Sequence, residues 1–208
     1  RAVGLLGIPA IGRLVAARAN CQVVLVMLHR FTTEGGVHLG ADPRQLRRTL
    51  VELRSAGVEL VSADQAVRDW DSSLEIRAGN SAKKAPRVAF TIDDGYADAL
   101  EVAGPIFAEF DCPATCFVVP EVVEQREWFW WDKIDTLLRA TDLRRLIVSF
   151  DGHNQSLGLG DAAARRFAFD VLCEWTKRLP TAAVPEFIEQ VGSALAAQVP
   201  SKAPEEYR

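Results

Sequence analysis

The chain has 208 residues, of which 49% are hydrophobic and 25% are charged, and its formal net charge at pH 7 is -4. This length suffices for a buried hydrophobic core, and the composition is that of a globular protein rather than a disordered one. The acidic balance and the lack of a Lys/Arg cluster exclude an electrostatic footprint for nucleic acid. The longest continuous run of hydrophobic residues, residues 23–28, is too short to span a bilayer.

Residues 1–20 form an N-terminal segment that we expect to be an amphipathic helix packed on the domain. Residues 3–17 are mostly apolar, but Arg13 interrupts the continuous apolar stretch that a signal peptide requires. The chain begins at Arg1 and its only methionine is Met27, so we expect that the gene product has residues before Arg1. The compartment, cytoplasm or cell envelope, stays open.

Residues 21–120 alternate between strand-like and helix-like stretches, which is typical of an α/β fold with parallel strands. Val23–Leu28 is a continuous apolar run, as expected for a strand that is buried on both faces. Asp42 and Pro43 have the residue types of a helix N-cap and a first helical position, and Gly57 ends the helix that they begin. Further strands are expected at residues 58–61, 87–92 and 114–119, with helices at residues 62–70 and 100–110.

Residues 121–208 have a different character, which we interpret as a helical insertion in an α/β repeat. An aromatic run at residues 128–131 leads into a helix, and a hairpin is expected around Asp151-Gly152, between strands at residues 146–150 and 156–159. Two more helices follow. Aromatic rings stack well on sugar faces, but the apolar spacing of the run continues into the helix and favours packing among the inserted helices.

The four cysteines are Cys21, Cys112, Cys116 and Cys173. The C-x3-C pair lacks the second pair of Cys or His that a zinc ribbon or finger needs. We therefore expect the cysteines to be small buried hydrophobic side chains.

Asp93, Asp94 and Gly95 directly follow the strand expected at residues 87–92. Sites in parallel α/β folds lie where strands end at their carboxyl side. Two adjacent carboxylates resist joint ionisation, and the conflict is resolved if one coordinates a metal ion while the other accepts a proton from water. The spacing alone fits equally well an Asx-type turn in which the carboxylates cap the next helix.

Three segments resemble the polysaccharide deacetylase family, whose members share a NodB-type homology domain. The segment Thr91-Ile92-Asp93-Asp94-Gly95 is similar to the T-[FI]-D-D-G motif of that family. Residues 113–118 resemble its P-A-T-x-F strand, and residues 26–31 its first strand, which commonly ends in a Tyr-His or similar pair. The resemblance covers residues 21–120, and the Trp-Trp-Asp stretch resembles an insertion that some members carry.

This resemblance implies a partial (β/α) barrel of polysaccharide deacetylase type. Residues 1–20 are its N-terminal helical segment, residues 21–120 the first part of the barrel, and residues 121–208 an inserted hairpin and helices. The implied activity is metal-dependent hydrolysis of N-acetyl groups on an amino-sugar polysaccharide or glycan.

The resemblance also implies the site residues. Asp93 is then the general base, and Asp94 is a ligand of a divalent metal, with zinc expected. His29 and Tyr96 are expected to contact the substrate or to support the metal ligand from behind. For His29 this follows from its place at the end of the first strand, where it would face the same pocket as the acidic pair, and a purely structural histidine is equally open.

The sequence departs from the family in the rest of the metal site. The deacetylases place two further ligands in an H-[ST]-x-x-H motif, whereas the histidines of this chain are His29, His38 and His153, and no two of them are four apart. Zinc normally needs three protein ligands, so we expect this fragment to be inactive. A closed barrel needs about seven or eight strands, and since four are predicted, we interpret the missing motif as truncation.

Two other functions stay open. A receiver-like phosphoacceptor or cation-binding switch also ends a strand in an acidic pair, and Asp151 would then be its acceptor, although the pair of such domains lies near the N-terminus. A degenerate deacetylase domain kept for sugar binding is the other alternative. A reading frame that continues into an H-x-x-x-H segment would distinguish truncation from degeneration.

Overall fold

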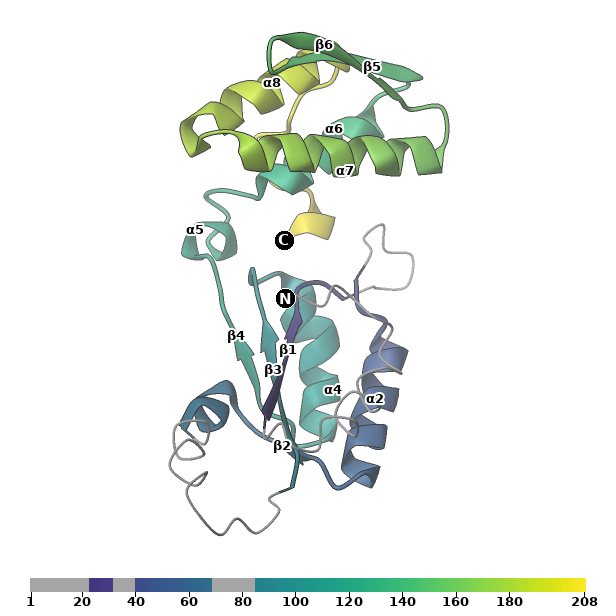
Figure 1. The fold of residues 1–208 in the computed structure, drawn as a ribbon. Helices are drawn as coiled ribbons and strands as arrows, with labels where there is room; N and C mark the ends of the chain where they lie inside the picture. The colour runs from purple at the N-terminus through teal and green to yellow at the C-terminus, as the bar shows by residue number, and fades with distance from the viewer. Residues whose placement is uncertain (1–22, 32–39, 69–84) are drawn as a thin grey trace, which may run out of the picture. The chain divides into compact units, whose positions relative to one another are not determined.

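The computed structural model describes residues 23–31, 40–68 and 85–208 (Figure 1). The chain divides into two compact units, residues 1–123 and 124–208. The helix expected in residues 1–20, together with Cys21 and His38, lies outside the described residues. No described helix is both long enough and apolar enough to cross a membrane.

A parallel four-stranded sheet forms the centre of the first unit. β3 (Arg87–Ile92) pairs along its whole length with β1 (Val23–Leu28) on one side. On the other side, β2 (Glu59–Leu60) pairs with the start of β3, and β4 (Ala114–Cys116) pairs with its end. Because all pairs are parallel, the carboxyl ends of β1, β3 and β4 meet at one edge of the sheet.

Two of the predicted strands are shorter in the structure. The strand expected at residues 58–61 is reduced to β2, although the Val61 N–H still donates to the carbonyl of Val88 over 2.9 Å. The strand expected at residues 114–119 ends at Cys116, because the chain then turns toward the carbonyl of Asp94. The α/β class with a parallel sheet is confirmed. The described strands do not close into a barrel.

The helix α2 (Pro43–Ser55) and the short helix α4 (Gly104–Glu109) pack on one face of this sheet. Asp42 caps α2 as predicted, since its carboxylate accepts a hydrogen bond from the N–H of Arg44 at 2.8 Å. Alternate residues of β1 and β3 point toward the helices. The core contains, among others, Leu28, Leu46, Leu50, Leu53, Val88, Phe90, Ile92, Ile106 and Phe107.

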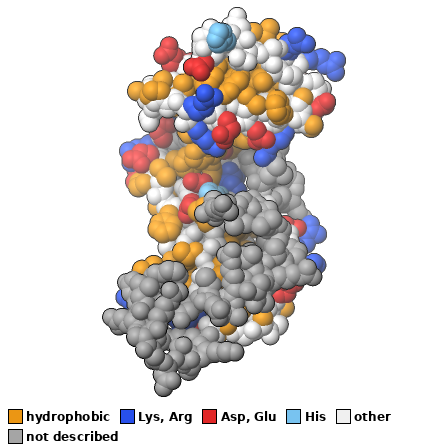
Figure 2. Space-filling view, viewed as in Figure 1, with side chains coloured by type: hydrophobic (Ala, Val, Ile, Leu, Met, Phe, Trp, Pro, Cys, Tyr) orange, Lys and Arg blue, Asp and Glu red, His pale blue; other side chains and the backbone are white. Residues whose placement is uncertain are grey.

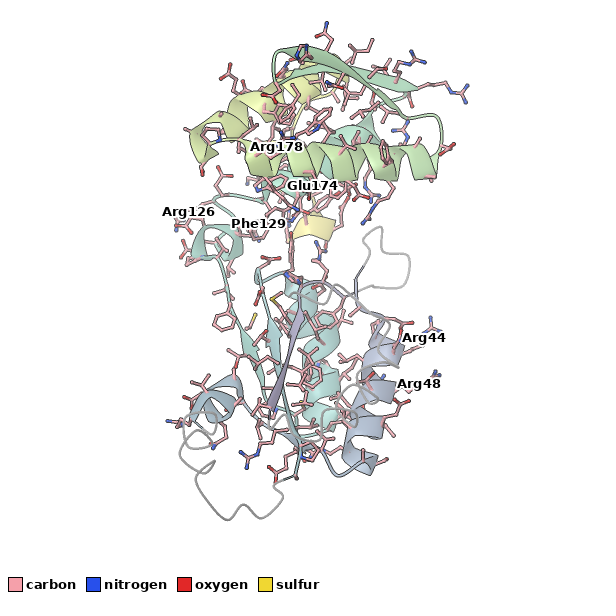
Figure 3. All side chains as sticks on the ribbon, viewed as in Figure 1. Arg44, Arg48, Arg126, Phe129, Glu174 and Arg178 are labelled. Carbon is pink, nitrogen blue, oxygen red and sulfur yellow. The ribbon has the colours of Figure 1, made fainter. Side chains whose placement is uncertain are left out.

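The outer face of α2 carries exposed arginines, and Arg44 and Arg48 project from it (Figure 3). Residues 63–68 are helical, and Ser62 caps this helix, since the N–H of Gln65 donates to its hydroxyl over 3.1 Å.

The helix after β3 begins with a widened turn. Ala99–Ala103 form a π-helix, η1, and the N–H of Gly104 donates to the carbonyl of Ala99, five residues back. Pro105 explains the shift, because it has no N–H for the carbonyl of Glu101 and its ring would clash with that carbonyl. Leu100, at the start of the helix expected at residues 100–110, is 78% exposed.

The second unit consists of a β-hairpin and three helices around a core of its own. Charged side chains of both signs alternate with apolar ones on its surface (Figure 2). The predicted hairpin is confirmed, and its turn residues Asp151 and Gly152 have φ angles of 56° and 77°, as an Asp-Gly type I′ turn requires. The elements are α6 (Trp130–Ala140), β5 (Arg145–Phe150), β6 (His153–Gly158), α7 (Ala162–Arg178) and α8 (Val184–Ala194).

Three shorter turns of helix complete the described chain. They are α5 (Pro120–Val123) in the first unit, and η2 (Thr181–Ala183) and η3 (Glu205–Tyr207) in the second. In η3, Tyr207 is 1% exposed, and its hydroxyl donates to a carboxylate oxygen of Asp135 on α6 at 2.6 Å. This contact fastens the last residues of the chain to the second core.

The aromatic run at residues 128–131, which extends into the start of α6, divides into two pairs. Trp128 is 7% exposed and lies 6.0 Å from the ring of Tyr207, and Trp130 packs against the second core. These two residues confirm the packing interpretation. Phe129 and Trp131 are partly exposed and stack on each other, with ring centroids 4.4 Å apart. A sugar-stacking role for this second pair stays untested.

Candidate functional site

The acidic pair lies at the carboxyl end of β3, between the ends of β1 and β4. The N–H of Asp93 donates to the carbonyl of Leu28 over 2.9 Å, which continues the pairing with β1. The N–H of Phe117 donates to the carbonyl of Ile92 over 2.8 Å, which continues the pairing with β4. The backbone at the tip of β3 is therefore held from both sides.

A sharp turn follows directly. Asp94 has a φ angle of 78°, and Gly95 has a φ angle of 85°. Left-handed conformations are unusual for residues other than glycine, and such strained residues cluster at functional sites. A Cβ atom on Gly95 would lie 3.0 Å from Val118 and 3.1 Å from Val123, so this position requires glycine for space as well as for conformation.

The alternative of a helix-capping turn is not supported by the described residues. The helix that follows has no side-chain cap hydrogen bond, and in the described segments neither Asp93 nor Asp94 accepts a hydrogen bond with its carboxylate. Both side chains are partly exposed. Within the described segments, the carboxylate oxygens of both residues therefore do not cap the helix.

The electrostatic surroundings link the predicted site residues. Burial raises the pKa of Asp94 above its ordinary value, the neighbouring charge of Asp93 raises it further, and His29 and Arg30 act in the opposite direction. His29 follows the last residue of β1 and is exposed. The structure thus brings His29, Asp93 and Asp94 into one neighbourhood, while their chemical roles stay predictions.

Tyr96 lies beneath the turn rather than on the surface. It is 2% exposed, and the guanidinium of Arg30 lies 3.8 Å from the centre of its ring. Of the two roles expected for Tyr96, support from behind agrees with this position. Arg30 and Asp98 were missed by the sequence reasoning. Their ion pair at 2.8 Å joins residues that are 68 positions apart, a separation at which no local pattern reports a contact.

The cysteines divide between the cores and the site. Burial raises the pKa of Cys112 to about 11 and that of Cys173 to about 12, in agreement with the predicted buried thiols. Cys116 is exposed, which corrects the prediction for this residue. It lies at the end of the edge strand β4, and partial burial and the charge of Asp93 raise its pKa.

The described residues do not by themselves fit a metal centre. Within residues 23–31, 40–68 and 85–208, no group of three or more His, Cys, Asp or Glu side chains is arranged to hold a metal ion. A zinc site normally uses at least three protein ligands. His153 is the first residue of β6 in the second unit and is exposed. The acidic pair therefore supplies at most a part of a donor set.

The placement of Asp151 does not agree with a receiver-like switch. In that alternative Asp151 would end a strand of the same sheet as the acidic pair. In the structure it lies in the turn between β5 and β6, which form a separate two-stranded antiparallel sheet.

No family model and no curated protein sequence matches the chain. Several solved structures are similar to it, among them the following three. The deacetylase PplD of Streptococcus pyogenes, in complex with acetate, has 24% identity and a TM-score of 0.39, and the match covers 49% of this chain and 44% of that one. A de-N-acetylase from Aggregatibacter actinomycetemcomitans has 14% identity and a TM-score of 0.40, with 81% and 76% covered. IcaB from Ammonifex degensii has 19% identity and a TM-score of 0.39, with 81% and 70% covered.

The chain spans less than half the length of the first of these proteins. All three likenesses lie below 25% identity and below a TM-score of 0.5, so they assign neither the fold nor the activity of this chain. The residues at the tip of β3 and the motifs around them remain the basis for a functional proposal.

Proposed function

We propose that this chain supplies the acidic part of a hydrolase site that removes N-acetyl groups from an amino-sugar polysaccharide or glycan. The observation that supports this proposal most strongly is the strained turn of Asp94 and Gly95, which keeps two carboxylates at the tip of a parallel strand. The resemblance of three segments to polysaccharide deacetylases agrees with it.

Asp93 is the proton acceptor in this proposal. An acetamide is a poor electrophile, so the attacking water has to lose a proton as the new bond forms. Asp93 suits this role because its backbone is fixed by pairing with β1, while its side chain is partly exposed. A carboxylate held in this way presents an oxygen to water without prior rearrangement.

Asp94 is the ligand that this chain offers to a divalent metal, for which zinc is expected. A bound metal supplies Lewis acidity to such a hydrolysis. Burial raises the pKa of Asp94 and so disfavours its charged form, and a bound cation would restore that form. Since the described residues do not complete a donor set, we propose that this fragment alone is inactive.

The test compares Asp93→Asn with Asp151→Asn in the intact gene product that carries this chain. Asp151→Asn is a matched control, because Asp151 is exposed in a hairpin turn and asparagine tolerates its positive φ angle. Acetate release from N-acetylglucosamine oligomers should fall by about 10²- to 10⁴-fold in Asp93→Asn, and the control should keep its rate. A rate for Asp93→Asn close to that of the control would contradict the assignment of the base.

The same assay tests the sugar-binding alternative. A protein that binds these oligomers, yet releases no acetate even before substitution of Asp93, would be a binding module. Oligomer binding is therefore measured by calorimetry beside the acetate assay.

A further inference from the structure

We propose that Arg30 is a positioning residue that fixes the turn of Asp93, Asp94 and Gly95 against the end of β1. This inference rests on the proposed function of that turn. Arg30 is neither the proton acceptor nor the metal ligand in this proposal, and it acts on the turn through Tyr96 and Asp98.

The side chain of Arg30 contacts both Asp98 and Tyr96. Its Nε donates to Oδ2 of Asp98 at 2.8 Å, and its guanidinium carbon lies over the ring of Tyr96, 3.8 Å from the ring centre. Only 15% of the Arg30 side chain and 8% of the Asp98 side chain are exposed. Arginine suits this place because its planar group can bind a carboxylate and stack on an aromatic ring at once.

The backbone from which Arg30 projects is itself held in place. Its carbonyl accepts a hydrogen bond from the N–H of Ala41 at 2.8 Å, and the N–H of Phe31 donates to Oδ2 of Asp98 at 3.3 Å. A Cβ atom on Gly40 would lie only 2.7 Å from the carbonyl oxygen of Arg30, so the backbone segments at these two residues approach as closely as glycine allows. Arg30 therefore extends from a rigid anchor.

Tyr96 and Asp98 follow the strained turn in the sequence. The chain before the turn is fixed where the N–H of Asp93 donates to β1, and the chain after it is fixed by Arg30. Asp94 and Gly95 lie between these two points, both with positive φ angles. A strained conformation persists only where its surroundings determine it, and Arg30 supplies an anchor on the side that follows the turn.

Asp98 depends on Arg30 for its charge balance. Its second oxygen, Oδ1, is buried without a hydrogen-bond partner among the described residues. A buried carboxylate without its cation is strongly disfavoured. Loss of Arg30 should therefore displace Asp98 and release the segment that follows the turn.

The experiment measures amide hydrogen exchange in the 208-residue chain and in three variants. Arg30→Met removes the anchor, Arg30→Lys keeps the charge but loses the planar group, and Arg48→Met is a control on the exposed face of α2 (Figure 3). Exchange at residues 93–96 should accelerate by about 10-fold or more in Arg30→Met, and less in Arg30→Lys. Amides of α2 should keep their protection in all three variants.

Two results would overturn the proposal. One is wild-type exchange at residues 93–96 in Arg30→Met. The other is equal acceleration in α2 and at the turn, which would indicate general destabilisation. If Arg30→Met does not fold, Arg30→Lys decides by the same comparison.

A kinetic measurement separates this inference from the proposed function. In the intact gene product, Arg30→Lys should lower kcat for acetate release about 10-fold with KM little changed, since misplaced groups lose transition-state stabilisation. Exchange reports the position of the turn whether or not acetate is released. Normal exchange in Arg30→Met, together with lost activity in Asp93→Asn, would reject the positioning role alone. Accelerated exchange in Arg30→Met, with no acetate release even from the parent protein, would reject only the hydrolase function.

Discussion

At the scale of single residues, the conformation of Asp94 and Gly95 decides what the acidic pair can do. Alternation along an ordinary strand would point neighbouring side chains to opposite faces of the sheet. The positive φ angles end this alternation directly after Asp93, so that the chain turns and both carboxylates stay at the tip of the strand. Glycine at position 95 is a condition for this geometry.

Gly95→Ala should destabilise the first unit by about 1–3 kcal/mol, because the new methyl group meets Val118 and Val123 and the φ angle is unfavourable. Gly104→Ala is the matched control, since its Cβ would find ordinary contacts at 3.7 Å or more. That change should be neutral or stabilising by up to about 1 kcal/mol. Urea unfolding followed by amide signals of β3 measures both, and equal stabilities would contradict the strained turn.

The pKa of Asp94 makes a second prediction at this scale. Burial raises this pKa in the folded, metal-free chain, so the folded state binds the proton more tightly than the unfolded state does. The contribution of the Asp94 carboxyl group to stability is then present at low pH, and it is lost as the pH rises through the pKa of Asp94 in the folded state. Asp94→Asn should therefore make the metal-free chain more stable at pH 7.

This gain should disappear as the pH falls below the ordinary carboxyl pKa of 3.8. Urea unfolding of both proteins across this range provides the measurement. A variant that is less stable than the parent chain at pH 7 would show that the carboxylate is favourably paired rather than desolvated.

At the scale of elements, local signals were predictable from the sequence and boundaries set by partners were not. The Asp-Gly hairpin turn and the Asp42 cap depend on residues that are adjacent in the chain. The end of β4 depends on where its pairing with β3 stops. A run of apolar residues in the sequence does not indicate this position. The π-helix η1 results from Pro105, whose effect on the preceding turn breaks the simple helical period.

A contact between two helices gives the prediction for this scale. Arg165 of α7 donates to the carbonyls of Leu138 and Thr141, the second at 3.1 Å, and so satisfies groups that the end of α6 leaves unbonded. Arg165→Met should destabilise the second unit by about 1–3 kcal/mol.

Arg166→Met is the control from the next position. Arg166 forms an exposed pair with Asp170, so its loss should cost less than about 1 kcal/mol. Thermal unfolding of the second unit, followed by its amide signals, distinguishes the two variants. Similar losses would mean that Arg165 stabilises α7 only as a surface charge.

At the scale of the whole molecule, the sequence predicted an α/β unit followed by a hairpin with helices, and the structure contains both. It also placed the acidic pair at a strand end and His29 near it. The predicted partial barrel is not confirmed, because the described strands form an open sheet, and closure depends on strands that are far apart in sequence. The pairing of Arg30 with Asp98 was hidden for the same reason.

The account depends on a division of labour within the acidic pair, and metal content measures that division most directly. In the intact gene product, Asp94→Asn should lose its bound zinc, whereas Asp93→Asn should retain an occupancy near that of the parent protein. Elemental analysis of the three purified proteins gives both values. Unchanged zinc in Asp94→Asn, or equal loss from both variants, would contradict the assignment of Asp94 as the ligand and Asp93 as the base.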